Sequence, residues 1–258
     1  MRGVLRPEEA AGRFTLARHD PSADLAPFVD YFWIVRWDLR GQPPHEQSIL
    51  PHPNVHLAFE ADGAAVYGVD TKIFTRRLAG AGKVLGVRFR PGCFRPFTRK
   101  PISLLNDAVV PAATLLGSPV ASASEKIMAA AADEDMIAIA AGLLRAISPP
   151  RDPVAEQVAE MVERITSDLG LRRVGDLTVA FGMTERKLQR LFSQYVGVSP
   201  KWVMRRARLH EAALRAGSGE PVDWATLAKD LGYADQSHLT RDFTATLGVP
   251  PARYAAPA

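Results

Sequence analysis

The sequence predicts an α+β protein of two domains: a small β-rich N-terminal domain, and an all-α C-terminal domain with two helix-turn-helix units joined by a connecting helix. The chain has 258 residues, which exceeds one typical domain of roughly 100–200 residues. Short β-type runs broken by Pro and Gly fill residues 1–110, and only helical patterns follow Pro150. Strands followed by helices are typical of two separate domains. We therefore expect a β-rich domain at 1–120, a helix with a Pro-containing linker at 121–150, and a helical domain at 151–258.

Three runs predict strands in the first domain: 28–37, 55–59 and 84–90. In the last of these, apolar side chains alternate with Gly and Arg, as in a strand with one buried face. An Ala-rich composition then predicts a helix over 122–147, which Ser148-Pro149-Pro150 ends. The Pro pair marks the expected boundary between the domains.

The helical half repeats itself with an offset of about fifty residues, which indicates that one structural unit occurs twice. The matching positions in the first copy are Leu177, Gly182, Leu188, Arg190, Phe192, Gly197, Val198 and Pro200. They recur as Leu227, Gly232, Leu239, Arg241, Phe243, Gly248, Val249 and Pro251. In each copy a short helix, over 174–181 or 224–231, ends at a Gly that can adopt the left-handed conformation. A second helix follows, so each copy is a helix-turn-helix, expected at 174–195 and 224–247.

The second helix of each copy separates an apolar face from a polar one. Apolar residues lie at helical spacing and are expected to be buried: Leu188, Leu191, Phe192 and Tyr195 in the first copy, and Leu239, Phe243 and Leu247 in the second. The opposite faces carry long hydrogen-bonding side chains that suit base edges, because Arg can bind guanine and Gln can bind adenine through two hydrogen bonds. A DNA major groove is wide enough to hold such a helix.

A basic helix is expected between the copies, from Pro200 to about Arg215. From Arg186 to His210 there are seven Lys or Arg residues and no Asp or Glu, which indicates an anion-binding surface. The helix would span roughly 24 Å and could hold two recognition helices in successive major grooves about 34 Å apart. We expect phosphate contacts, which orient a protein without specifying a sequence, from Lys187, Lys201, Arg205 and Arg206.

These segments closely resemble the AraC/XylS family of transcription regulators, over about Pro153 to Tyr254. The resemblance lies in Gly-Met-Thr-Glu-Arg-Lys-Leu-Gln-Arg-Leu-Phe at 182–192, Val-Gly-Val-Ser-Pro at 196–200, Gly-Tyr-Ala-Asp-Gln-Ser-His-Leu-Thr-Arg-Asp-Phe at 232–243 and Leu-Gly-Val-Pro-Pro-Ala-Arg-Tyr at 247–254. It implies that the base-contacting residues are Arg186, Gln189 and Arg190 in the first unit, and Gln236, Ser237, His238, Thr240 and Arg241 in the second.

The first domain resembles a poorly characterised N-terminal domain of some of these regulators, around 48–59 and 85–97. This resemblance implies a sensing or dimerising role and brings no known ligand. The expected partners are double-stranded DNA, RNA polymerase, a small-molecule effector at the N-terminal domain and a second copy of the chain. The alternative is a small-molecule-binding or interaction protein whose helical domain does not recognise a DNA sequence.

Enzymatic and metal-binding classes are not favoured by the sequence. It has neither a Gly-x-Ser-x-Gly nor a His-Glu-x-x-His motif, so we expect no catalytic site, no metal and no cofactor. Alkyl-DNA repair proteins can carry a similar helical module, but their metal-held acceptor chemistry needs several cysteines, and this chain has only Cys93, expected to be a packed side chain. No signal peptide or run of 18 apolar residues is present, which predicts a cytoplasmic protein without membrane contact. His45, His52 and His56 match no metal template and are expected at surface or turn positions.

A second basic stretch, Thr71 to Lys100, carries nine basic residues and no acidic one. Three interpretations are open: a solvated face of the sheet, a contact with DNA that flanks the site, or the lining of a pocket for an anionic effector.

Overall fold

A computed structural model describes residues 3–6 and 10–255. Its N-terminal domain is built on a six-stranded sheet in the order β1-β2-β7-β4-β5-β8, with antiparallel neighbours throughout. The strands are β1 (Thr15–His19), β2 (Val29–Leu39), β4 (His56–Glu60), β5 (Gly63–Tyr67), β7 (Gly80–Phe89) and β8 (Val109–Pro111). The three runs expected to be strands are therefore strands, in β2, β4 and β7.

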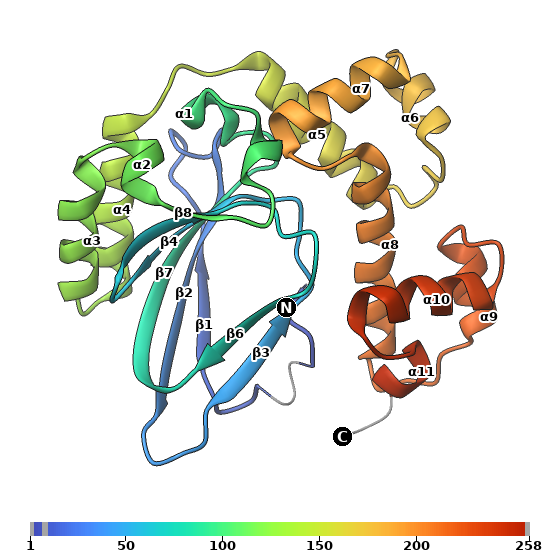
Figure 1. Ribbon diagram of the computed structural model, residues 1–258, viewed down its shortest axis with the longest axis horizontal. Helices are drawn as coiled ribbons and strands as arrows, with labels where there is room; N and C mark the ends of the chain where they lie inside the picture. The colour runs from blue at the N-terminus through green and yellow to red at the C-terminus, as the bar shows by residue number, and fades with distance from the viewer. Residues whose placement is uncertain (1–2, 7–9, 256–258) are drawn as a thin grey trace.

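A second, two-stranded sheet lies across one face of the large sheet (Figure 1). It consists of β3 (His45–Ile49) and β6 (Phe74–Leu78), which pair antiparallel. Side chains alternate along a strand, so β2 presents Phe32 and Ile34 to one side and Trp33, Val35 and Trp37 to the other. The first set is fully buried, whereas the second set faces the small sheet across a cavity.

Helices cover the other face of the large sheet. Short helices follow β7, namely α1 (Arg95–Thr98), the 3₁₀ helix η1 (Ile102–Leu105) and α2 (Ala112–Leu116). Two longer ones, α3 (Pro119–Ala129) and α4 (Asp133–Ile147), pack against each other and against the sheet. The single helix expected over 122–147 is thus two helices. The chain between them is extended at Ala130 and Ala132, and the change of direction there lets both helices place Ala and larger apolar side chains on the same core.

Two glycines in β7 make room for two tryptophans of β2. Trp33 is paired with Gly86 and Trp37 with Gly82, so each indole crosses the neighbouring strand at its glycine. A Cβ atom on Gly86 would lie 1.9 Å from Trp33, and one on Gly82 would lie 2.4 Å from Trp37. Both indoles consequently lie flat on the sheet and form one wall of the cavity.

We expect Gly86→Ala to lower the free energy of unfolding by about 1–3 kcal/mol, because the added methyl group overlaps the Trp33 ring in a packed region. Gly142→Ala is the matched control. Gly142 lies in α4 with open space around its Cα, so the same substitution should raise the free energy of unfolding by about 0.5–1 kcal/mol. Urea unfolding of both variants checks this, and equal stabilities would contradict the described position of Trp33.

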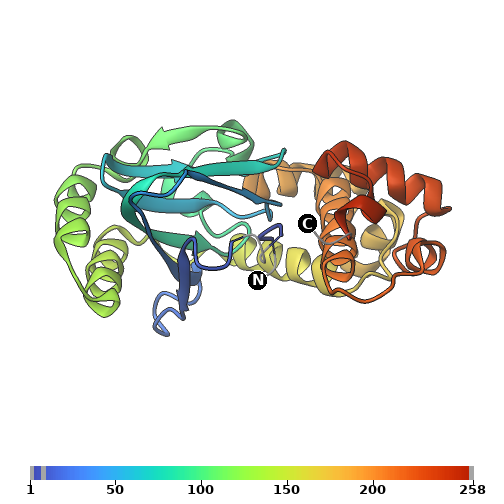
Figure 2. The same ribbon diagram turned by 90° about the horizontal axis from the view of Figure 1, so that it is seen from below.

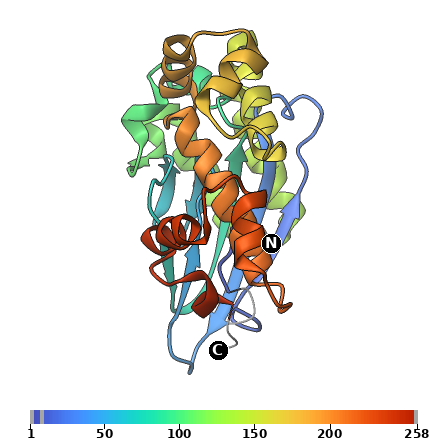
Figure 3. The same ribbon diagram turned by 90° about the vertical axis from the view of Figure 1, so that its right-hand side faces the viewer.

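The C-terminal half contains helices only, within the part of the chain that the structure describes. These are α5 (Pro153–Ser167), α6 (Val174–Phe181), α7 (Glu185–Leu191), the π-helical turn η2 (Phe192–Val196), α8 (Pro200–Ala216), α9 (Trp224–Asp230), α10 (Gln236–Leu247) and α11 (Pro251–Tyr254). In Figure 3, α8 runs between an upper group of α5 to α7 and a lower group of α9 to α11. None of the helices described in residues 3–6 and 10–255 is long and apolar enough to cross a membrane.

The hydrophobic cores do not follow the expected domain boundary. The largest core joins the sheet, α3 and α4 to the first helix-turn-helix unit, and it includes Phe94 and Ile102 beside Leu188 and Phe192. A smaller core joins Leu5 and Leu50 of the N-terminal half to the second unit. The two halves therefore form one packed body, elongated as Figure 2 shows.

Cys93 lies where the halves meet and is a packed side chain, as expected. It is 1% exposed, and its Sγ lies 3.9 Å from the carbonyl oxygen of Ala155 on α5. Burial raises the pKa of the thiol to about 11, so the protonated form dominates near neutral pH.

Candidate nucleic-acid interface

The first helix-turn-helix unit consists of α6 and α7 joined at Gly182. Gly182 has φ 60°, the left-handed conformation expected at the end of the first helix. Thr184 then begins α7, and its side chain accepts a hydrogen bond from the backbone NH of Lys187. Leu188 and Phe192 are fully buried, which fixes the opposite face of α7 outward.

The outward face of α7 carries the expected side chains. Arg186, Gln189 and Arg190 are all exposed, and so is the phosphate-contact candidate Lys187. The Gln189 amide donates to Glu185 at 2.9 Å, an exposed interaction that a base edge can replace. Within the described residues, no carboxylate forms an ion pair with Arg186 or Arg190, so both guanidinium groups are open to an anion or a base.

The second unit repeats this arrangement. Gly232 has φ 73°, and Asp235 begins α10 by accepting from the backbone NH of His238 at 2.7 Å. Leu239 and Phe243 are fully buried. The outward residues are Gln236, Ser237, His238 and Arg241, all exposed, together with Thr240, which is half-buried.

The connecting helix α8 holds the two units at its ends (Figure 1). Its 17 residues span about 26 Å. Arg205 of α8 forms an ion pair with Asp242 of α10, and the same carboxylate accepts from the Tyr233 hydroxyl at 2.7 Å. Burial, together with this hydrogen bond, raises the pKa of Tyr233, which keeps the phenol protonated as the donor. These contacts fix α10 rigidly on α8.

The expected phosphate contacts on α8 separate into exposed and buried residues. Lys201 is exposed, and Arg205 is exposed but paired with Asp242. Arg206, which was expected to contact a phosphate, is instead buried. The residue is only 4% exposed, and its guanidinium lies over the Trp202 ring and donates to the carbonyl oxygen of Thr71 at 2.8 Å. Arg206 contacts the N-terminal half, because it lies on the face of α8 opposite to solvent, and it is not available to a phosphate in this arrangement.

Two comparisons with protein families bear on these units. Residues 177–256 match a family described as a helix-turn-helix domain, which covers both units and the helix that joins them. This C-terminal domain is an AraC-type helix-turn-helix domain. The chain with this AraC-type domain is accordingly a DNA-binding transcription regulator. Residues 17–111 match a second family, described as a domain of unknown function (DUF6597), which covers the large and small sheets in front of the AraC-type domain.

The solved structures to which the chain is similar include several of ToxT from Vibrio cholerae. A structure at 1.65 Å resolution has a TM-score of 0.41 and 13% identity, covering 94% of this chain and 98% of that chain. ToxT of strain SCE256 bound to an unsaturated fatty acid has a TM-score of 0.40 and 13% identity, covering 98% and 92%. No sequence among the curated proteins matches the chain.

Proposed function

We infer that the chain recognises a bipartite promoter sequence, with α7 and α10 in successive major grooves on one side of the duplex. The observation that carries this proposal is the presence of two matched, exposed polar helix faces at the two ends of one rigid helix. Each face offers Arg and Gln side chains, which distinguish base pairs in the major groove by two hydrogen bonds. One chain would thus contact two half-sites about one helical turn apart.

Base contacts are assigned to the exposed residues of both helices. These residues are Arg186, Gln189, Arg190, Gln236, Ser237, His238 and Arg241, and the half-buried Thr240 is assigned with them. Lys187 and Lys201 are assigned to phosphates, and Arg205 can reach a phosphate by exchanging its partner Asp242. RNA polymerase, a small-molecule effector held by the N-terminal domain and a second copy of the chain are further proposed partners, with the N-terminal domain modulating DNA affinity.

Selection of preferred sequences from a random duplex pool tests this function. The full chain should enrich two short motifs whose centres lie about 10–11 base pairs apart. The winning duplex should bind at least about a thousandfold more tightly than random DNA at physiological salt, and should keep most of that preference when the salt concentration is doubled.

Two results would overturn the proposal. A single enriched motif would mean that only one unit contacts bases. Binding that is equal for all sequences and disappears at the higher salt would mean that the AraC-type domain contacts phosphates alone, and the alternative of a small-molecule-binding or interaction protein would then hold.

A further inference from the structure

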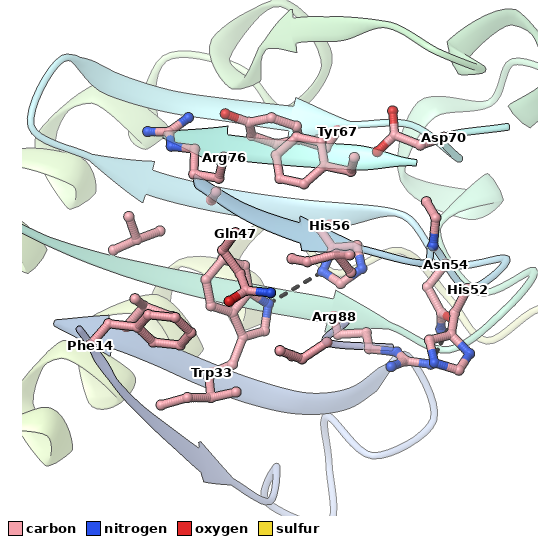
Figure 4. A pocket seen from close by; sticks show the side chains of 18 of the residues that line it. Phe14, Trp33, Gln47, His52, Asn54, His56, Tyr67, Asp70, Arg76 and Arg88 are labelled. Carbon is pink, nitrogen blue, oxygen red and sulfur yellow. Dashed lines mark hydrogen bonds between the residues drawn. The ribbon is translucent and has the colours of Figure 1, made fainter. Parts of the chain in front are cut away.

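A cavity of about 220 Å³ lies between the large and the small sheet of the N-terminal domain (Figure 4). The flat indoles of Trp33 and Trp37 form one wall, and Phe74 and Leu78 of β6 lie in the opposite wall. Most of the lining is therefore apolar or aromatic. An aromatic wall suits a planar ring, because ring systems attract each other in offset-stacked or edge-to-face arrangements.

His56 offers a hydrogen-bond donor to this cavity. Burial and the nearby Arg88 guanidinium lower the pKa of His56 to about 3, so the imidazole is neutral. Its Nδ1 accepts from the Trp33 indole NH at 3.2 Å, so its proton must be on Nε2. The hydrogen bonds of the described residues include none to Nε2, and the ring lines the cavity. His56, a strand residue rather than the surface or turn histidine expected, can thus donate to a ligand.

Two of the three arginines in the lining, Arg76 and Arg88, are already paired with carboxylates, and the third, Arg18, is exposed with its guanidinium over the Tyr31 ring. Arg88 lies 3.1 Å from the Asp30 carboxylate and donates to the Tyr31 hydroxyl and to Asn54, each at 2.8 Å. Arg76 forms an ion pair with Glu60, which also accepts from the Tyr67 hydroxyl at 3.0 Å. To pair with Arg76 or Arg88, an anionic ligand would have to displace a carboxylate partner, and breaking a partly buried ion pair is costly because it leaves the displaced charge without compensation.

The size of the cavity sets the size of the ligand. A cavity of about 150 Å³ holds benzene, so about 220 Å³ holds two fused rings. We propose that this cavity binds a flat, uncharged, bicyclic aromatic molecule with one hydrogen-bond acceptor, which stacks on Trp33 and accepts from His56 Nε2.

Two loops at one end of the cavity connect it to α8. Pro51 and His52 line the cavity, and the Pro51 carbonyl oxygen accepts from His210 of α8 at 3.3 Å. The His52 and His210 rings stack with centroids 3.8 Å apart. Asp70 lines the cavity from the second loop, where the next residue, Thr71, accepts the hydrogen bond from Arg206.

Arg206 and His210 are one helical turn apart on the same face of α8, the helix that carries both DNA-binding units. A ligand that shifts either loop must therefore act on α8. Occupancy of the cavity thus changes DNA affinity through these two contacts, and this part of the inference rests on the function proposed above. The change in the free energy of DNA binding can only be as large as the difference in ligand-binding free energy between the two arrangements of the loops and α8.

Binding to the full chain, without DNA, tests the ligand class by isothermal titration at pH 8. Quinoline should bind with a Kd below about 1 mM. Naphthalene has the same shape but no acceptor, and it should bind about 3–10-fold more weakly. Naphthalene-2-sulfonate should be the weakest of the three. Tightest binding by the sulfonate, or no binding of quinoline at 1 mM, would overturn the ligand class.

Filling the cavity tests the location. Val35→Trp on β2 and Ile49→Trp on β3 each place an indole in the cavity, and either should reduce quinoline affinity at least tenfold. Val154→Trp, at a position on α5 that is 37% exposed, should leave the quinoline affinity unchanged. Thermal unfolding identifies a variant that does not fold. If one of the two cavity-filling variants fails to fold, quinoline binding by the other one tests the location. Undiminished quinoline binding in a folded filling variant would place the ligand elsewhere.

The coupling is tested on the duplex selected from the random pool. Saturating quinoline should change the affinity of the wild-type chain for this duplex at least threefold. Arg206→Met keeps an apolar stem on Trp202 but loses the bond to Thr71, so it should bind quinoline normally and lose that change. An unchanged response in Arg206→Met, or none in the wild type despite binding, would overturn the coupling. Failure of DNA recognition itself would appear separately, in the selection without quinoline.

Discussion

Phe192→Ala should lower the free energy of unfolding by about 3–5 kcal/mol, the largest effect that we expect from one substitution. Phe192 is fully buried at the start of η2, which packs against η1 and α5. Its ring belongs to the core that the AraC-type domain shares with the sheet domain, so the space it leaves cannot be filled by moving one helix. Urea unfolding followed by circular dichroism measures the loss.

Leu104→Ala is the control for Phe192. Leu104 lies in η1 within the same region, but its side chain is 67% exposed, so its removal should change the free energy of unfolding by less than about 0.5 kcal/mol. Comparable losses in the two variants would mean that η1 and η2 do not share a packed core in solution.

Arg190→Ala and Arg241→Ala should each weaken binding to the selected duplex by about 1–3 kcal/mol, if each side chain contacts a base. The two positions correspond in the repeat and lie on the exposed faces of α7 and α10. Because they lie in different units, the losses in the double variant should add. Fluorescence anisotropy on the selected duplex and on random duplex checks this prediction.

Lys126→Ala removes one exposed cation from α3 of the sheet domain and should leave both affinities unchanged. Equal losses on selected and random DNA in the arginine variants would instead show that Arg190 and Arg241 contact phosphates.

The elements of the helical half could be predicted from the sequence because local signals specify them. Gly182 and Gly232 end their helices, and the expected bounds of α6 agree with the structure. The continuation of α7 as a π-helical turn could not be predicted in this way. It depends on Phe192 packing between η1 and α5, elements that lie far away along the chain.

The burial of Arg206 was beyond sequence reasoning for a similar reason. Nothing in its neighbourhood distinguishes it from Arg205, and only the N-terminal half supplies the Thr71 carbonyl oxygen that binds it. The sequence does carry a signal for the cavity wall. Trp33 and Trp37 lie four residues apart in β2, and Gly82 and Gly86 lie four residues apart in β7. Only the register of β2 against β7 shows that each glycine faces a tryptophan.

The basic stretch from Thr71 to Lys100 divides among several environments. Arg76 and Arg88 line the cavity with internal partners, Lys83 donates to the Ala130 carbonyl oxygen, and Arg99 and Lys100 are exposed. None of the three interpretations of this stretch therefore applies to all of it.

The unbroken course of α8 also has a consequence for the promoters that the protein would control. A continuous helix cannot lengthen, so the distance between the two DNA-binding units acts as a ruler. A signal from the sheet domain can change the orientation of α8 as a whole, but it cannot change the distance between the two DNA-binding units. Natural operators would then vary in their bases and in their distance from the start of transcription, while the number of base pairs between the two half-sites stays constant.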